Sequence, residues 1–251
     1  NTNTNTKVTT PHPNKLAETN PNNVKALLEA CSTGVMTAIE TLLQQTTYTI
    51  ADIDAATRVC VQLGRLAILQ LLFTKGARPN DVDRFGRTLF HVACENNRLT
   101  IMMWLISQGS TSIVEHVDTK GIGALHLAAR CGHLEIGSFL LRTSPSLVGK
   151  RCHLGKTALI YACEAGHLQV VETLLNAGAA INTRDGAVRS TVHAAATLSE
   201  PLLLRWLFDH PHASQYGLSV NAADKFGLTP IHIATSLRVD VLNGKNVNLD
   251  T

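Results

Sequence analysis

The sequence lacks the features that mark several large classes of protein. Only 4% of its 251 residues are aromatic, and it has no run of about eighteen apolar residues that could cross a membrane. The first residues, NTNTNTKVTTPHPNKLAETNP, contain no apolar segment and cannot form a signal peptide. The net charge of +3 is too small to demand nucleic acid or a membrane surface as a partner. Because 45% of the residues are nevertheless apolar, we expect a folded protein with a core of Ala, Leu, Val and Ile.

Motifs for catalysis and metal binding are also missing. The six cysteines form no Cys-x-x-Cys pair, and no Gly-x-Ser-x-Gly, His-Glu-x-x-His, kinase or dinucleotide-binding motif occurs. Gly155-Lys156-Thr157 resembles the end of a phosphate-binding loop, but that loop requires glycine at position 150, where this chain has Lys150. We therefore predict that the protein is not an enzyme and uses neither a cofactor nor a metal.

What the chain does contain is a repeat. Four stretches align on a glycine: RFGRTLFHVACENN, TKGIGALHLAARCGH, HLGKTALIYACEAGH and KFGLTPIHIATS, and a fifth, VRSTVHAAATLS, fits without that glycine. The residues at the threonine position follow one another at intervals of 35, 34, 33 and 39, and they are Thr88, Gly123, Thr157, Ser190 and Thr229. A period near 33 residues, with a motif similar to Thr-Pro-Leu-His, resembles the ankyrin repeat.

This resemblance implies an all-α fold, an ankyrin-repeat solenoid of stacked helix-turn-helix units with projecting hairpin loops. Amphipathic second helices follow each motif, and two more diverged units lie upstream of the first. We predict a disordered polar tail over residues 1–20 and an ankyrin-repeat domain over 21–251. Its seven units lie at about 21–47, 48–80, 81–114, 115–148, 149–182, 183–220 and 221–251.

The repeat also accounts for most of the histidines. Six of the eleven recur at repeat positions, and they are His91, His126, His193, His232, His133 and His167. The resemblance implies that these imidazoles hydrogen-bond neighbouring loops and tie one unit to the next. The fifth unit has Ile160 in this position, which interrupts the series. At the same junctions Gly155 would relieve a tight turn, and Thr157 is placed to cap the following helix.

The cysteines have a structural and a chemical interpretation. Cys31, Cys94 and Cys163 precede the turn between helices, where small buried residues let the helices approach closely. Cys152 lies among basic residues on a hairpin loop, a setting that could lower its pKa. No third group completes a catalytic set, so a plain loop cysteine is the alternative.

The sixth unit is enlarged. Ser199 and Pro201 predict a helix start, and the segment 209–220 predicts a long loop. This loop is either tolerated growth or a finger specific for a partner, with Trp206 in the core and Tyr216 exposed. Two histidines of the loop, His210 and His212, are too few for a closed metal site.

In ankyrin stacks a partner lies against the hairpin tips and the exposed faces of the first helices. Near the tips we count ten Lys or Arg residues against five aspartates, and arginine beside phenylalanine is typical of an interface. The predicted partner-binding residues are Arg84, Phe85, Arg87, Lys120, Ile122, Arg130, Arg151, His153, Lys156, Arg184, Lys225 and Phe226.

The sequence thus predicts a non-catalytic scaffold or adaptor for protein–protein interaction, a monomer in the cytoplasm or nucleus. Its partner would present an acidic, partly apolar segment. Alternatively, the chain is the ankyrin targeting module of a larger enzyme, channel or signalling protein, as its start at Asn1 and its weak C-terminal unit indicate. Binding of anionic lipid or nucleic acid by the basic tips is a third hypothesis, which the small net charge disfavours.

Overall fold

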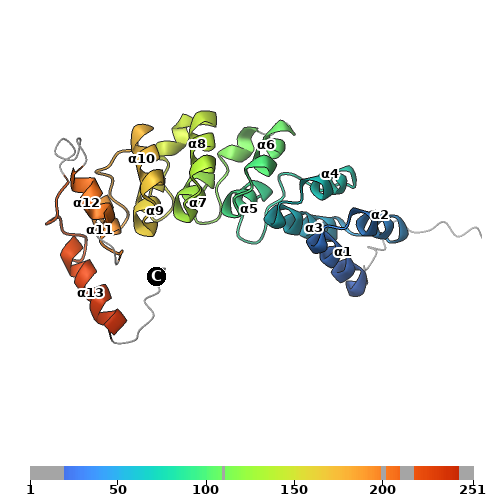
Figure 1. The fold of residues 1–251 in the computed structure, drawn as a ribbon, viewed down its shortest axis with the longest axis horizontal. Helices are drawn as coiled ribbons and strands as arrows, with labels where there is room; N and C mark the ends of the chain where they lie inside the picture. Colours follow the sequence, from blue (N-terminus) through green and yellow to red (C-terminus); the bar gives the residue numbers. More distant parts are fainter. Residues whose placement is uncertain (1–19, 109–110, 199–201, 210–217, 243–251) are drawn as a thin grey trace, which may run out of the picture. The chain divides into compact units, whose positions relative to one another are not determined.

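The computed structural model describes residues 20–108, 111–198, 202–209 and 218–242 (Figure 1). Within these residues the chain forms α-helices, short loops and two isolated β-bridges, and it contains no strand. The predicted all-α fold is confirmed. The predicted polar tail lies outside the described residues as far as residue 19.

The described residues divide into two compact units, of which the first contains residues 20–60 and 67–77. Its elements are α1 (Pro21–Thr33), α2 (Met36–Gln45), most of α3 (Ile50–Leu63) and most of α4 (Leu66–Thr74). Helix α1 begins where the Asn20 side chain accepts a hydrogen bond from the Asn22 N–H at 3.0 Å. It ends at Gly34, which adopts the left-handed conformation that glycine allows without strain.

The second unit contains residues 61–66 and the described residues from 78 to 242. Its helices are α5 (Leu89–Glu95), α6 (Leu99–Ser107), η1 (Thr111–Val114), α7 (Ala124–Cys131), α8 (Leu134–Thr143), η2 (Pro145–Gly149), α9 (Ala158–Ala165), α10 (Leu168–Asn176), α11 (Thr191–Ala195), α12 (Leu202–Asp209) and α13 (Pro230–Leu242).

Within this second unit the first helices of the repeats form one row. Helix α5 packs on α7, α7 on α9, and α9 on α11, while α6, α8 and α10 form the other row (Figure 1). Small residues allow the close approach of the first row, since Ala93, Ala128 and Ala162 are fully buried. Cys94 and Cys163 are also fully buried, as predicted, and burial raises the pKa of both thiols above the usual range.

The hairpins that precede the first helices are joined into a ladder by backbone hydrogen bonds. In each of the last four of the five hairpins, one backbone N–H near the tip donates to a carbonyl in the hairpin before it, over 2.8 to 3.0 Å. The four pairs are Thr119 to Phe85, His153 to Lys120, Gly186 to Leu154, and Lys225 to Ala187. The tips are therefore held at fixed spacing by the backbone itself.

A hydroxyl contacts the histidine three residues later at three of the five junctions, since Gly123 has no hydroxyl and Thr157 has no histidine at that place. The hydroxyl oxygens of Thr88, Ser190 and Thr229 each lie 2.8 to 2.9 Å from Nδ1 of the histidine three residues later. Thr157 has Ile160 at that place, so its buried hydroxyl has no hydrogen-bond partner. The prediction that Thr157 caps its helix through this side chain is wrong, because the hydroxyl lacks the imidazole that its counterparts contact.

This exception predicts opposite effects of the same substitution. Thr157→Val should raise the free energy of unfolding by about 1 kcal/mol, because it removes a buried hydroxyl that has no partner. Thr88→Val should lower it by about 1 kcal/mol, because it removes the contact with His91. Urea denaturation of both variants measures the difference, and effects of the same sign would contradict this account.

Most of the repeat histidines connect neighbouring units, as predicted. Their Nε2 atoms lie 3.1 to 3.2 Å from backbone carbonyls of the next or the preceding unit. The pairs are His126 with Lys150, His193 with Leu228, His133 with Glu95, and His167 with Arg130. His91 departs from this pattern, since its Nε2 has no partner among the described residues, and the contact found for His232 is with Thr229 of its own unit.

The last two units are only partly described. Ser199, Pro201, His210, His212 and Tyr216 lie outside the described residues, so the predicted helix start and most of the enlarged loop stay predictions. Trp206 was expected in the core and is half-buried on α12.

Candidate partner-binding surface

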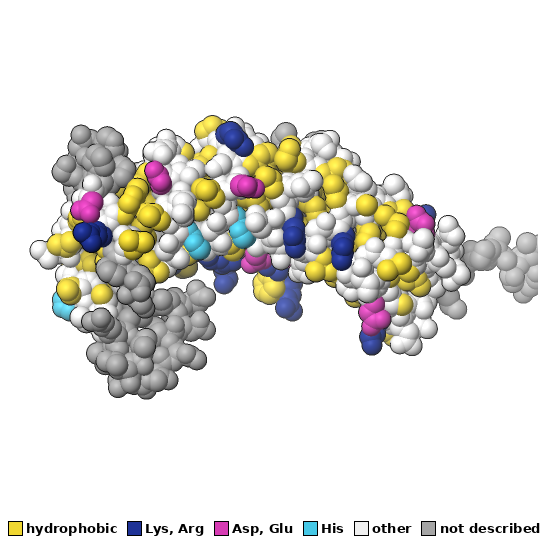
Figure 2. Space-filling view, viewed as in Figure 1, with side chains coloured by type: hydrophobic (Ala, Val, Ile, Leu, Met, Phe, Trp, Pro, Cys, Tyr) yellow, Lys and Arg dark blue, Asp and Glu magenta, His cyan; other side chains and the backbone are white. Residues whose placement is uncertain are grey.

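The hairpin tips of the second unit expose apolar and basic side chains together. We define the tips as residues 83–87, 118–122, 152–156, 185–189 and 224–228. Phe85, Leu154 and Phe226 have 45%, 60% and 71% of their surface exposed. The Arg84 guanidinium lies 4.7 Å from the centre of the Phe85 ring, and the Lys225 ammonium lies 4.8 Å from that of Phe226. Figure 2 shows Lys and Arg side chains beside a hydrophobic one along the lower edge of the face drawn.

The aspartates of these tips point inward. Each begins its tip, and its Oδ1 accepts the backbone N–H groups two and four residues later over 2.8 to 2.9 Å. The four are Asp83, Asp118, Asp185 and Asp224, of which the last two are buried. Burial alone would raise the pKa of Asp83, but hydrogen bonds from the N–H groups of Arg87 and Phe85, with the Arg87 side chain, hold it below its usual value.

This geometry changes the charge balance predicted from the sequence. In the count from the sequence, each tip aspartate is a surface acid that offsets one basic residue. Because their carboxylates close the hairpins instead, they are structural groups, and the outer surface of the tips is more basic than the count suggests. The recurrence of aspartate at one place in four tips is the signal that would have identified this role.

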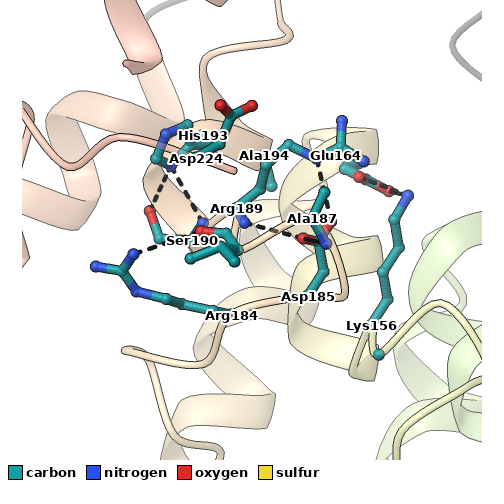
Figure 3. A network of polar contacts seen from close by, with 12 residues as sticks. Lys156, Glu164, Arg184, Asp185, Ala187, Arg189, Ser190, His193, Ala194 and Asp224 are labelled. Atoms are coloured by element: carbon teal, nitrogen blue, oxygen red, sulfur yellow. Dashed lines mark hydrogen bonds and ion pairs between the residues drawn. The ribbon is translucent and has the colours of Figure 1, made fainter. Parts of the chain in front are cut away.

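Several basic residues of this surface are bound by other groups of the protein. Arg87, Arg130, Lys156 and Arg189 form ion pairs, and Arg151 donates hydrogen bonds to the backbone. Arg87 contacts Asp83 at 2.9 Å and Glu95 at 3.2 Å, and Arg130 contacts Glu95 at 3.2 Å. The other ion pairs are Lys156 with Glu164 at 2.8 Å and Arg189 with Asp185 at 3.1 Å (Figure 3). Arg151 is anchored differently, because its Nη1 donates to the carbonyls of Gly155 and Arg184 over 2.8 and 2.6 Å.

Five basic residues of the surface have no acid partner, and the anchored Arg151 is one of them. Among the described residues, no acid forms an ion pair with the exposed side chains of Arg84, Lys120, Arg151, Arg184 or Lys225. His153 is also exposed. Ile122 is buried, with only 9% of its surface exposed, so it supports the hairpin rather than the outer face.

Cys152 is buried in its hairpin. It occupies the place of the tip aspartates, has only 5% of its surface exposed, and lies 3.5 Å from the Tyr161 hydroxyl. Burial, and then the contact with Cys152, raise the pKa of Tyr161 above its usual range. These contacts fit the interpretation of Cys152 as a structural residue of the hairpin.

The described residues contain no group of three or more His, Cys, Asp or Glu side chains that could hold a metal ion. They also contain no helix with the length and apolar character needed to span a membrane.

Comparison with known proteins agrees with the repeat pattern. The family model of ankyrin repeats matches residues 57–148 and 111–185, together about half of the chain. The chain is 30% identical to the mouse B-cell lymphoma 3 protein homolog over 181 residues, covering 71% of this chain and 39% of that protein. It is 25% identical to bovine NF-kappa-B inhibitor zeta over 194 residues, 75% of this chain and 26% of that protein.

A further relative is a channel. The Caenorhabditis elegans homolog of transient receptor potential cation channel subfamily A member 1 is 24% identical over 221 residues, 87% of this chain but 18% of that protein. The chain therefore spans well under half of the length of each of these relatives.

Proposed function

Because the chain belongs to the ankyrin-repeat family, a family of protein-interaction modules, we propose that it acts as a non-catalytic scaffold or adaptor that binds a protein partner through its hairpin tips. The exposed faces of the first helices complete the surface. The specificity would come from the side chains of the tips, because the fold itself is shared by proteins of many functions.

The observation that supports this proposal is the division of charge at the tips. The acids are used inside the hairpins, while Arg84, Lys120 and Lys225 stay exposed without an acid partner among the described residues. Exposed phenylalanines lie directly beside two of these cations. A segment with acidic and apolar side chains complements both properties.

The exposed faces of the first helices contribute less charge than the tips. Glu95 pairs with Arg87 and Arg130, and Glu164 pairs with Lys156. These pairs leave the first-helix positions nearly neutral. We expect them to set the shape of the surface, while the tips attract the acidic groups of the partner.

A charge-matched comparison tests the proposal. One bait has Arg84→Glu, Lys120→Glu and Lys225→Glu at the tips. The control bait has Lys75→Glu, Arg142→Glu and Arg205→Glu, three exposed cations elsewhere, so both baits change the net charge equally. Captured proteins from source cells are compared by mass spectrometry.

We expect the unchanged chain and the control bait to capture the same partner, and the tip bait to lose at least about 90% of it, since each lost charge contact is worth about 1 kcal/mol or more. Equal capture by both variants would contradict a role for the tips. Circular dichroism of each bait shows that it is folded.

The second candidate is the ankyrin module of a larger enzyme, channel or signalling protein. The short share of each relative that the chain covers favours it, including 18% of a protein named as a cation channel. An antibody raised against this chain distinguishes the two, because a protein much longer than 251 residues on a denaturing gel supports the larger protein. For the scaffold we propose the cytoplasm or nucleus, where free cysteines such as these are the rule.

A further inference from the structure

The hairpins of the fifth and sixth units differ from the other three at the position directly before the tip. The residue there is Val82, Val117 or Ala223 in three hairpins, but Arg151 and Arg184 in these two. The basic pair is therefore not a default of the repeat. It lies where two neighbouring hairpins meet.

The Arg151 side chain is anchored on the backbone of the hairpin that carries Arg184. Arg151 Nη1 donates to the Arg184 carbonyl at 2.6 Å and to the Gly155 carbonyl at 2.8 Å. The hairpins themselves are tied by the Gly186 N–H to the Leu154 carbonyl at 2.8 Å. The Arg151 guanidinium is thus fixed before any ligand arrives, which lowers the entropy that binding would cost.

The donors of this pair are only partly used. A guanidinium has five N–H donors, and the two bonds of Arg151 involve Nη1 alone. Arg184 makes a single long contact of 3.5 Å, from Nη1 to the Val188 carbonyl. Figure 3 shows its guanidinium on the opposite side of the hairpin from the Asp185 carboxylate. Both side chains are exposed, and no described acid pairs with either.

The nearby acids are removed or neutralised. Cys152 stands where the other four tips have aspartate, so the residue after Arg151 has no carboxylate. Asp185, the residue after Arg184, is buried and has its oxygens occupied by two backbone N–H groups and by Arg189 Nε. The missing carboxylate at position 152 makes the potential at the pair more positive than at the other tips, while Arg189 offsets the charge of Asp185.

We propose that Arg151 and Arg184 form a binding site for a phosphorylated serine or threonine side chain of the partner protein. A phosphate carries a charge of about −1.5 to −2 and three acceptor oxygens, which match two guanidinium groups better than one carboxylate does. The inference rests on the proposed function, because it assigns one group of the partner to one place on the same surface.

The chain itself supplies conservative test variants. Arg151→Val and Arg184→Val copy the residues of sister hairpins, and Cys152→Asp restores the aspartate that four sisters have. Arg84→Thr copies Thr119 and removes one positive charge from another tip, so it is the charge-matched control. Circular dichroism confirms that each variant is folded.

The probes are three pools of acidic, partly apolar peptides that differ only in a central serine, glutamate or phosphoserine. Binding of the full 251-residue chain is measured by fluorescence polarisation at constant ionic strength. We expect the phosphoserine pool to bind about tenfold more tightly than the glutamate pool. Arg151→Val, Arg184→Val and Cys152→Asp should each remove most of this preference for phosphoserine over glutamate. Arg84→Thr should weaken the binding of the phosphoserine and glutamate pools by the same factor.

The outcomes separate the two proposals. Equal binding of the glutamate and phosphoserine pools would overturn the phosphate site and leave the acidic partner standing. Binding of neither pool would overturn both. A parallel assay uses vesicles that contain a phosphoinositide, and vesicle binding that depends on Arg151 without any preference for phosphoserine would identify a lipid head group instead and overturn the proposal.

Discussion

Replacing Gly155 by alanine should lower the free energy of unfolding by roughly 3 kcal/mol or more. Gly155 has φ of +72°, a conformation in which an L-residue is strained by about 1 to 2 kcal/mol. An added Cβ would also lie 2.7 Å from the backbone nitrogen of Gly186, closer than real Cβ contacts. The neighbouring hairpin would have to shift, which strains the Gly186 N–H bond to the Leu154 carbonyl.

Gly227 provides the matched control. It occupies the same place in the last hairpin with φ of +78°, but nothing lies within 4 Å of an added Cβ. Gly227→Ala should therefore cost only the backbone strain of about 1 to 2 kcal/mol. Urea denaturation of both variants gives the difference, which reports the contact between hairpins. Equal losses would show that this contact contributes nothing to stability.

The same hairpin shows what the sequence could predict. The glycine spacing and the Thr-x-x-His motif are enough to predict helical repeats, because glycine and the capping residues determine the turn and the helix start within a few residues. The alternation of first and second helices follows from their apolar periodicity. These features are determined within one unit, so a single sequence reveals them.

The site was predicted less completely, because side-chain direction depends on the folded hairpin. Sequence alone gave the tip cations, but it could not show that Asp185 turns inward or that Ile122 is covered. It also placed Cys152 on a hairpin loop among basic residues, but it could not show that the hairpin buries this thiol against Tyr161. Each error concerns a residue whose neighbours come from backbone geometry or from another helix.

Thr157 illustrates a different limit. Its type and position are right for a helix cap, yet its hydroxyl is left without a partner by Ile160, three residues away. Thr157 follows the repeat and Ile160 departs from it, and only their combination has an energetic consequence. A pattern scored position by position does not register such coupling.

Acid should destabilise the second unit through His91, by about 2 kcal/mol between pH 7 and 5 and about 3 kcal/mol by pH 4. Burial, and then the neighbouring His116, lower the pKa of His91 from 6.5 to about 4. The unfolded chain therefore binds a proton near pH 6.5 that the folded chain takes up only near pH 4. The stability is complete above pH 6.5 and is lost as the pH falls through this interval.

The hydrogen bonds of His91 explain why the folded state resists protonation. Nδ1 accepts the Thr88 N–H at 3.3 Å and lies 2.9 Å from the Thr88 hydroxyl, so the proton of the neutral ring resides on Nε2. A second proton on Nδ1 would break the bond to the Thr88 N–H. His116, with its ring centre 5.7 Å away, adds repulsion when it is charged, while Asp118 favours the charged form more weakly.

His91→Gln separates this titration from the packing. Glutamine at this position can still accept the Thr88 N–H, as in a capping box, but it does not bind a proton in this range. We expect the variant to lose about 2 kcal/mol less than the wild-type chain when the pH falls from 7 to 5. Urea denaturation at the two pH values gives this difference, and NMR titration of the His91 ring gives its pKa directly. If both chains lose the same stability, the buried imidazole is not the group that makes the repeats sensitive to acid.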